Sequence, residues 1–357
     1  MLQQFGIPAL FAFGLTFVLG LLARKFFPKF GLMDRPEKYG LKRDPIPYYG
    51  GLLLYAGFFT TVLLFVPLDL HIGVFLLAAT LIMGVSFVDD LIGLSPILRL
   101  IVQVVAALML VFAGIGILSI SNPLGDPLVL DNWKVFFTLD RVYEFSVFSA
   151  LFTVIWVVVI VNTMNFLDGL NGLPSGIAVI AGVSLFLLSV RSGMHFDASS
   201  QVPVAMMSLI LSATALAFWF FDFYPAKILM GDTGSMFLGF VIATMAIFSG
   251  GKITTAFLVM GFPILDAIWV ILRRILQGKS PMKGDLKHLH HRLLDSGLSQ
   301  RGALYMIYAV SIVFGAIAVF LEGINKLYAI VALILLMVFV GGVLVRLASN
   351  RTLKKND

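Results

Sequence analysis

The sequence predicts an all-α protein, a polytopic bundle of about eleven transmembrane helices with its N-terminus outside and its C-terminus in the cytoplasm. Hydrophobic residues make up 60% of the 357 positions, charged residues only 12%, and the mean hydropathy is +1.01. This composition excludes a soluble domain with a charged surface. Cysteine is absent, so disulfides and thiolate chemistry are ruled out as well.

Apolar segments recur along the whole chain, most of them close to the roughly 20 residues that a helix needs to cross a bilayer. They cover residues 5–23, 48–67, 70–88, 98–118, 145–166, 174–190, 202–221, 234–250, 253–272, 303–321 and 327–345. We therefore treat 1–357 as a single integral membrane domain. In the long loop before the fifth segment, the strand-like stretch 128–139 predicts a short hairpin outside the membrane.

The orientation follows from the basic residues. All but five of the 25 lysines and arginines lie in loops on one side of the predicted bundle. The five exceptions are Lys134, Arg141, Arg191, Lys252 and Lys326. Because basic loops stay in the cytoplasm, this asymmetry places the loops after the odd-numbered helices there. The net charge of +6 is thus mainly a topological signal, and nucleic-acid binding does not follow from it.

Unusual polar residues gather in loops of that same side. These loops span residues 24–47, 89–98, 167–174, 222–234 and 273–302. Random placement would rarely put all of them on one side, so we infer one composite site at the cytoplasmic membrane surface. Soluble cytoplasmic substrates could reach such a site.

Asp89 and Asp90 end the third apolar segment, where ionisable groups at membrane depth are costly and mark candidate sites. Two adjacent carboxylates repel each other unless a cation lies between them. With oxygen ligands and no cysteine, Mg²⁺ is the expected cation, and Mn²⁺ is an alternative. The structural alternative is that the pair caps a loop near Arg99, or is simply solvated.

Asn162, Asn165 and Asp168 follow at intervals of three and therefore share one face of the fifth helix. Gly169 and Gly172 then allow the backbone to turn. Amides in membrane bundles commonly bond between helices, and for Asn162 this alternative is as good as a role in the site.

Lys227 and the stretch 231–235 (GDTGS) place a cation, a carboxylate and a flexible turn at the start of the eighth helix. The free N–H groups of a helix start suit a phosphate. Asp232 is accordingly a candidate metal ligand, and its alternative role is that of a helix N-cap.

The loop after the ninth helix is rich in cations and histidines. It follows Asp266 and contains Lys279, Lys283, Lys287, His288, His290, His291 and Arg292. The spacing supports no closed set of four zinc ligands, so phosphate recognition is favoured over metal binding. The alternative is an ordinary positive-inside loop. The stretch 278–280 (GKS) is no P-loop, because Arg273 stands where the first glycine belongs.

Taken together, these motifs resemble the polyprenyl-phosphate N-acetylhexosamine 1-phosphate transferases over nearly the whole chain. The resemblance is carried by 45–51 (PIPYYGG), Asp89-Asp90, 162–172 (NTMNFLDGLNG), 225–235 (PAKILMGDTGS), 263–274 (PILDAIWVILRR) and 287–297 (KHLHHRLLDSG). The histidine string is similar to that of the undecaprenyl-phosphate GlcNAc-1-phosphate transferases. The family's first loop has Arg-Lys-x-His where 39–42 read YGLK, and a lysine where Ile97 stands. Lys42 and Arg99 are candidates to replace the missing cations.

This resemblance implies Mg²⁺-dependent transfer of GlcNAc-1-phosphate from UDP-GlcNAc or a related UDP-sugar to undecaprenyl phosphate, with release of UMP. It implies a bacterial inner-membrane enzyme of cell-envelope synthesis, serving teichoic acid or lipopolysaccharide, and a homodimer. The implied catalytic residues are Asp89, Asp90, Asp232 and His290, with Asp232 and Asp90 as metal ligands. The implied substrate contacts are Asn162, Asn165, Asp168, Asn171, Lys227, Asp266, His288, His291, Arg292, Lys42 and Arg99. Direct displacement is favoured because a phosphate monoester is already largely a dianion at neutral pH, while Asp89 as base or nucleophile stays open.

Three alternatives differ in function. A phospho-MurNAc-pentapeptide transferase is the related one within the family. A transporter would carry its carboxylates towards mid-membrane, often in repeated halves, which this sequence lacks. An intramembrane prenyltransferase would need two DxxxD-type clusters, and there is no second cluster beside Asp89-Asp90.

Overall fold

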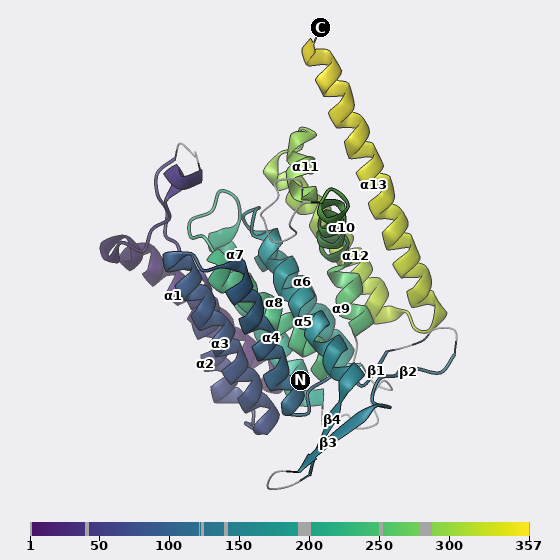
Figure 1. Cartoon of the computed structure of the whole chain (residues 1–357). Helices are drawn as coiled ribbons and strands as arrows, with labels where there is room; N and C mark the ends of the chain where they lie inside the picture. Colours follow the sequence, from purple (N-terminus) through teal and green to yellow (C-terminus); the bar gives the residue numbers. More distant parts are fainter. Residues whose placement is uncertain are drawn as a thin grey trace.

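The computed structural model describes residues 2–39, 43–120, 122, 125–138, 142–191, 201–249, 253–278 and 288–356. Figure 1 shows its helices packed side by side in one bundle. The helices are α1 (Ile7–Phe26), α2 (Gly51–Phe65), α3 (Leu70–Ile92), α4 (Pro96–Phe112), α5 (Val147–Leu167), α6 (Leu173–Val190), α7 (Val202–Asp222), α8 (Gly231–Phe248), α9 (Ile253–Val259), α10 (Gly261–Leu276), α11 (Leu289–Asp295), α12 (Gln300–Phe320) and α13 (Ile324–Asn356). Four short strands complete the fold: β1 (Ser119–Ile120), β2 (Leu128–Val129), β3 (Lys134–Thr138) and β4 (Val142–Ser146).

The helix lengths confirm an all-α protein that passes through a membrane several times. Within the described residues, eight helices are long and apolar enough to cross a bilayer, and the bent pair α9–α10 would make a ninth. The two remaining predicted spans form helices of only 15 and 17 residues, α2 and α4. Eleven crossings therefore remain a prediction, as does the side on which each terminus lies.

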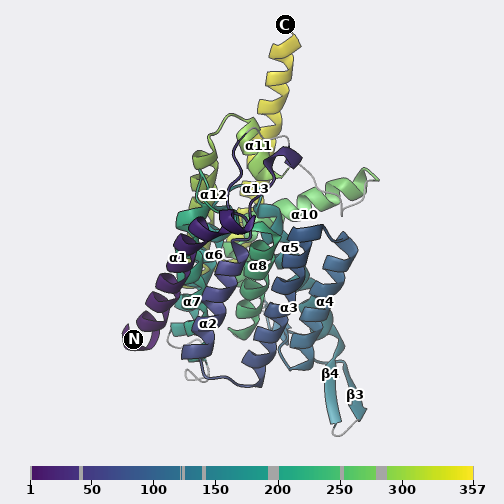
Figure 2. The same ribbon diagram turned by 90° about the vertical axis from the view of Figure 1, so that its left-hand side faces the viewer.

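The predicted helix over 253–272 is not continuous, because the chain bends by 81° between α9 and α10. Pro263 explains the break: it has no N–H to donate to the carbonyl of Val259, and its ring crowds that carbonyl. At the bend Gly261 packs against Leu333 of α13, where an added Cβ would come within 2.2 Å of a Leu333 methyl group. Figure 2 shows α10 running across the direction of its neighbours and projecting from the bundle.

α8 is the centre of the packing. In its apolar stretch 89% of the residues are buried, against 28% in the first helix and 22% in α13. Helices α3, α5, α2 and α6 surround it, and Phe237 and Phe240 lie fully buried between them. A helix that is apolar on all sides is expected in such a position. Asp232, at its first turn, is thereby placed in the middle of one end of the bundle.

The predicted hairpin near 128–139 exists, but its strands pair differently. β3 pairs with β4 in antiparallel register, Lys134 opposite Ser146, while β2 pairs with β1. The second strand therefore uses residues 142–146, and the first three of these residues precede the predicted fifth helix. The hairpin lies at the end of the bundle opposite to α11 and the C-terminus (Figure 1).

Candidate functional site

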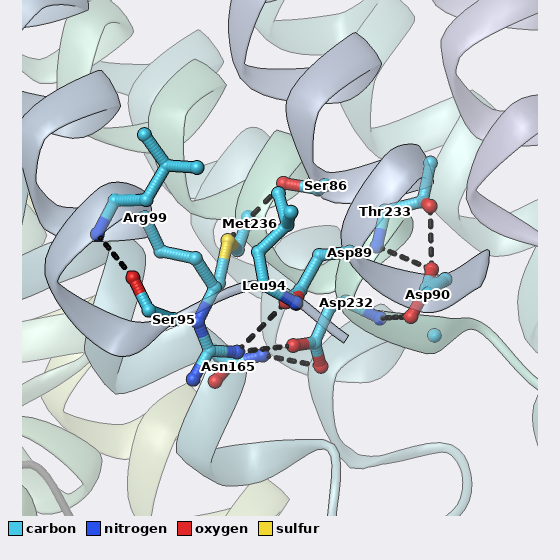
Figure 3. Close-up of polar contacts among 12 residues, drawn as sticks. Ser86, Asp89, Asp90, Leu94, Ser95, Arg99, Asn165, Asp232, Thr233 and Met236 are labelled. Atoms are coloured by element: carbon cyan, nitrogen blue, oxygen red, sulfur yellow. Dashed lines mark hydrogen bonds and ion pairs between the residues drawn. The ribbon is translucent and has the colours of Figure 1, made fainter. Parts of the chain in front are cut away.

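Asp90, near the end of α3, holds the start of α8. Its Oδ1 accepts hydrogen bonds from the Tyr48 hydroxyl and the Asp232 N–H, both at 3.0 Å. Its Oδ2 accepts from the Thr233 N–H at 2.9 Å and the Thr233 hydroxyl at 2.5 Å (Figure 3). The prediction of free N–H groups at this helix start is thus wrong for Asp232 and Thr233, because a carboxylate from a neighbouring helix already occupies them.

Gly231 makes this approach sterically feasible. Its φ of +75° suits glycine, and an added Cβ would come within 2.7 Å of the Asp90 Oδ2 atom. Burial, followed by the negative charge of Asp90, raises the pKa of the Tyr48 hydroxyl, so Tyr48 stays protonated and donates its hydrogen bond. The GDTGS stretch therefore forms the first turn of α8, and its backbone contacts Asp90 directly.

Asp89 has a different task from its neighbour. Its Oδ1 accepts the Leu94 N–H at 2.6 Å, which closes the turn between α3 and α4, and its Oδ2 accepts from Arg99 at 2.9 Å. Ser95 caps α4 by accepting the Leu98 N–H, with Pro96 as the first helical residue, and so sets Arg99 one turn into the helix. These contacts agree with the structural alternative for Asp89, in which it caps a loop near Arg99.

Asp232 lies between a cation and an amide. Its Oδ2 accepts from the Arg99 Nη1 at 2.6 Å and its Oδ1 from the Asn165 amide at 2.8 Å. Its side chain keeps 29% of its surface exposed, whereas that of Asp89 keeps 7%. Asp232 does not cap its own helix, since Asp90 does so. Figure 3 shows Asp89, Asp232 and Arg99 converging from three helices.

Asp168, directly after α5, is the unpaired carboxylate of the group. No hydrogen bond to its side chain exists among the residues that the structure describes. Burial raises the pKa of Asp168 well above its usual range, and the charges of Asp222, Asp232 and Asp90 raise it further. An excess of negative charge thus surrounds the end of α5. Asn171 lies in the same turn, half-buried.

The histidine segment is held against this turn by Asp266 of α10. Asp266 contacts the His288 Nδ1 at 3.0 Å and accepts the Leu289 N–H at 2.9 Å. The ring of His290 then lies over Gly169, where an added Cβ would come within 2.6 Å of its Nε2. Burial, with His291 and His288 nearby, lowers the pKa of His290 to about 3, so its ring is neutral. Asp266 therefore acts here by positioning the histidines.

The remaining predicted residues lie around this centre or outside it. The Asn162 amide donates to Gln103 of α4 at 2.6 Å, which is the interhelical bond offered as its alternative. Lys227 is exposed beside the start of α8, while His291 and Arg292 are half-buried on α11. Lys42 lies outside the described residues, as do the three lysines at 279, 283 and 287.

Several contributing residues were missed from the sequence. Tyr48 and Thr233 bond Asp90, and Gln103 bonds Asn162. Asp222 is buried at the end of α7 and accepts from Ser175 at 2.7 Å, and its charge raises the pKa of Asp168. Asp222 ends an apolar helix as Asp89 does, so the same signal of a carboxylate at membrane depth could have found it.

The carboxylates suit a divalent cation whose remaining ligands are water and substrate phosphates rather than protein side chains. Among the described residues, no three acidic or histidine side chains come together as a complete metal site. Mg²⁺ is commonly bound by one or two carboxylates, with water and substrate phosphates completing the shell. The partly exposed Asp232, and Asp168, whose side chain has no hydrogen bond among the described residues, match that chemistry, whereas both Asp90 oxygens already accept two hydrogen bonds each.

Comparison with known proteins adds independent information. Residues 72–250 match the sequence model of glycosyl transferase family 4. The chain is 30% identical over 325 residues to a probable undecaprenyl-phosphate N-acetylglucosaminyl 1-phosphate transferase of Bacillus subtilis, covering 89% of this chain and 85% of the relative. It is 32% identical over 338 residues to a decaprenyl-phosphate N-acetylglucosaminephosphotransferase of Mycolicibacterium smegmatis, covering 86% and 79%. It is 27% identical over 329 residues to an undecaprenyl-phosphate alpha-N-acetylglucosaminyl 1-phosphate transferase of Salmonella typhi, covering 88% and 82%.

Proposed function

The chain belongs to glycosyl transferase family 4, and on this premise we propose that it transfers GlcNAc-1-phosphate from UDP-GlcNAc to undecaprenyl phosphate, giving undecaprenyl-diphosphate-GlcNAc and UMP. The printed activities of the three relatives support the acceptor class and the sugar. They do not favour the phospho-MurNAc-pentapeptide alternative. The observation that carries the proposal for the site is the convergence of Asp89, Asp232 and Arg99, with Asn165, at one end of the bundle.

Phosphoryl transfer depends mainly on positioning and on neutralising charge. In the proposed reaction an oxygen of the lipid phosphate attacks the phosphorus that carries the sugar. A new P–O bond forms while the bond to UMP breaks, and UMP leaves with the electron pair. The acceptor is already largely a dianion, so no protein group is required to remove a proton first.

Each part of the site has a task in this scheme. A divalent cation held by Asp232, with Asp168 or Asp90 beside it, would neutralise negative charge on the donor pyrophosphate. Arg99, which contacts Asp232, and Lys227, which is exposed just before the start of α8, would contact phosphate. Asn165 orients Asp232 through its amide, and Asp266 presents the neutral His290 towards the α5–α6 turn.

We place this end of the bundle at the cytoplasmic face of a bacterial inner membrane. The basic loops support that orientation, because the cations crowd the same loops as the candidate site. Undecaprenyl phosphate would then approach from the lipid and the nucleotide sugar from the cytosol. The pathway served, teichoic acid or lipopolysaccharide, would follow from the product, and a homodimer remains part of the proposal.

The test is transfer of radiolabel from UDP-[¹⁴C]GlcNAc into a butanol-extractable lipid by the purified protein, with measured release of UMP. We expect both products, dependent on Mg²⁺ or Mn²⁺, and their loss in Asp232→Asn. A panel of other UDP-sugars, including UDP-MurNAc-pentapeptide, would serve as competing donors. Label transfer only from the pentapeptide donor, or from no donor, would contradict the proposal.

A second measurement separates direct from double displacement. Protein incubated with β-³²P-labelled donor alone is denatured and counted for covalent label. Direct displacement predicts no labelled protein, whereas label that is lost in Asp89→Asn would show that Asp89 acts as a nucleophile.

A further inference from the structure

Arg99 lies at the position in the site where a metal held by Asp232 would need room. A single nitrogen, Nη1, contacts both the Asp89 Oδ2 at 2.9 Å and the Asp232 Oδ2 at 2.6 Å. Within the part of the chain that the structure describes, no other cation pairs with Asp232. The guanidinium thus bridges two carboxylates from different helices, and it does so through one shared atom.

Negative charges outnumber positive charges around this bridge among the described residues. Asp90 is satisfied by four donors that carry no charge of their own, and Asp168 has no donor among the described residues. Arg99 is therefore the one described positive charge against Asp89 and Asp232. A divalent cation at Asp232 would relieve the excess negative charge, but it would also lie beside a permanently charged guanidinium and be repelled by it.

We propose that Arg99 is a resident cation that competes with the metal for Asp232 and so makes metal binding depend on the donor substrate. This inference rests on the proposed function for the identity of the donor. Without donor, the guanidinium holds Asp232 and keeps the affinity for free metal low. With donor, Arg99 would donate its hydrogen bonds to a phosphate of the donor, and Asp232, released from Arg99, would be free to hold the metal.

Asp89 would keep Arg99 in the site after Arg99 has released Asp232. Asp89 is fixed by its bond from the Leu94 N–H and already accepts from the same Arg99 nitrogen. Arg99 can release Asp232 without losing its other carboxylate partner. The planar guanidinium has five N–H donors, so it can bond Asp89 and a phosphate oxygen at the same time.

The experiment measures binding of Mn²⁺ to the purified full-length protein, from the electron paramagnetic resonance signal of free Mn²⁺, with and without UDP as a pyrophosphate probe. UDP-bound Mn²⁺ in solution is subtracted using a protein-free titration. We expect Arg99→Gln to bind Mn²⁺ at least tenfold tighter than wild type in the absence of UDP. We also expect UDP to strengthen Mn²⁺ binding several-fold less in Arg99→Gln than in wild type.

Three variants control the comparison. Arg43→Gln removes a different guanidinium, which pairs with Asp34, and should leave Mn²⁺ affinity unchanged. Asp232→Asn should abolish the UDP-dependent Mn²⁺ binding of wild type, and, combined with Arg99→Gln, the tight Mn²⁺ binding of that variant. Arg99→Lys, whose single ammonium presents no fork, should give an intermediate affinity, and it keeps the comparison available if the glutamine variant does not fold.

Two outcomes overturn the inference. Mn²⁺ affinity in Arg99→Gln equal to or weaker than wild type shows that Arg99 does not compete with the metal. Unchanged Mn²⁺ binding in Asp232→Asn shows that the metal binds elsewhere. The radiolabel assay is independent: wild-type protein without transfer activity, but with the expected Mn²⁺ results, would refute the proposed function and leave the role of Arg99 supported.

Discussion

Asp90→Asn tests whether Asp90 is needed to build the site as well as to operate it. Each Asp90 oxygen accepts one backbone N–H and one hydroxyl. Asparagine keeps the shape but has only one accepting oxygen, so one backbone N–H of Asp232 or Thr233 would face an amide NH₂. A hydroxyl can rotate away from that clash, but a backbone N–H cannot.

The expected loss of stability follows from this count. A buried donor left without an acceptor costs about 1–3 kcal/mol, and because Asp90 is half-buried we take about 2 kcal/mol. We expect the midpoint of thermal unfolding, followed by tryptophan fluorescence in detergent, to fall by several degrees, together with loss of label transfer. Tyr48→Phe is the matched control, since it removes one hydroxyl donor and strands no backbone group, and should cost about 0.5–1.5 kcal/mol.

The result that would refute this reasoning is an Asp90→Asn protein that is inactive yet as stable as wild type. Asp90 would then act on the substrates or the metal, as the resemblance implies, and its four hydrogen bonds would contribute little to folding. Loss of stability in Tyr48→Phe equal to that in Asp90→Asn would also contradict it.

Three further predictions concern the α5–α6 turn. Gly169→Ala should displace His290, whose Nε2 lies 2.6 Å from the added Cβ, and raise the KM for donor in the transfer assay, while Gly73→Ala, which meets nothing within 4 Å, should not. Because the pKa of His290 is lowered to about 3, the folded protein binds fewer protons than the unfolded chain between about pH 3 and pH 6.5. The free energy of unfolding, measured by denaturant titration, should therefore fall as the pH is lowered through that range, by up to about 1.4 kcal/mol per pH unit, and less steeply in His290→Gln. The pKa of Asp168 is raised, so ionising it at rising pH destabilises the fold; Asp168→Asn should unfold at a higher temperature than wild type at pH 8 yet show no label transfer.

The fold class followed from composition, because long uncharged apolar runs have few alternatives to membrane helices. The boundaries of α2 and the bend before α10 did not follow. Hydropathy does not register that Pro47 and Leu229 pair their backbones ahead of α2, nor that Pro263 interrupts an apolar run. The start of α2 and the bend before α10 both depend on backbone hydrogen bonds that are made or lost, and an average of hydropathy values does not include these bonds.

The sequence predicted which residues form the candidate site, but not which of them contact one another. The positions of Asp89, Asp90, Asp232 and Arg99 at the ends of apolar segments predicted that these residues lie at one surface. The sequence does not indicate that the two adjacent carboxylates of α3 contact different neighbours. Asp89 bonds the turn before α4, whereas Asp90 bonds the start of α8. That division of roles depends on how three helices pack, which has no signature in local spacing.

The deep burial of α8 bears on how the protein responds to its membrane. A bilayer that becomes thicker or thinner acts on the surfaces that touch lipid, and it is accommodated by tilting or snorkelling of the outer helices. α8 presents almost no such surface, whereas only 22% of the residues in the apolar stretch of α13 are buried. The depth of Asp232 is therefore set by its protein neighbours, and lipids of different acyl-chain length should shift the periphery of the bundle while leaving the chemistry at the same level.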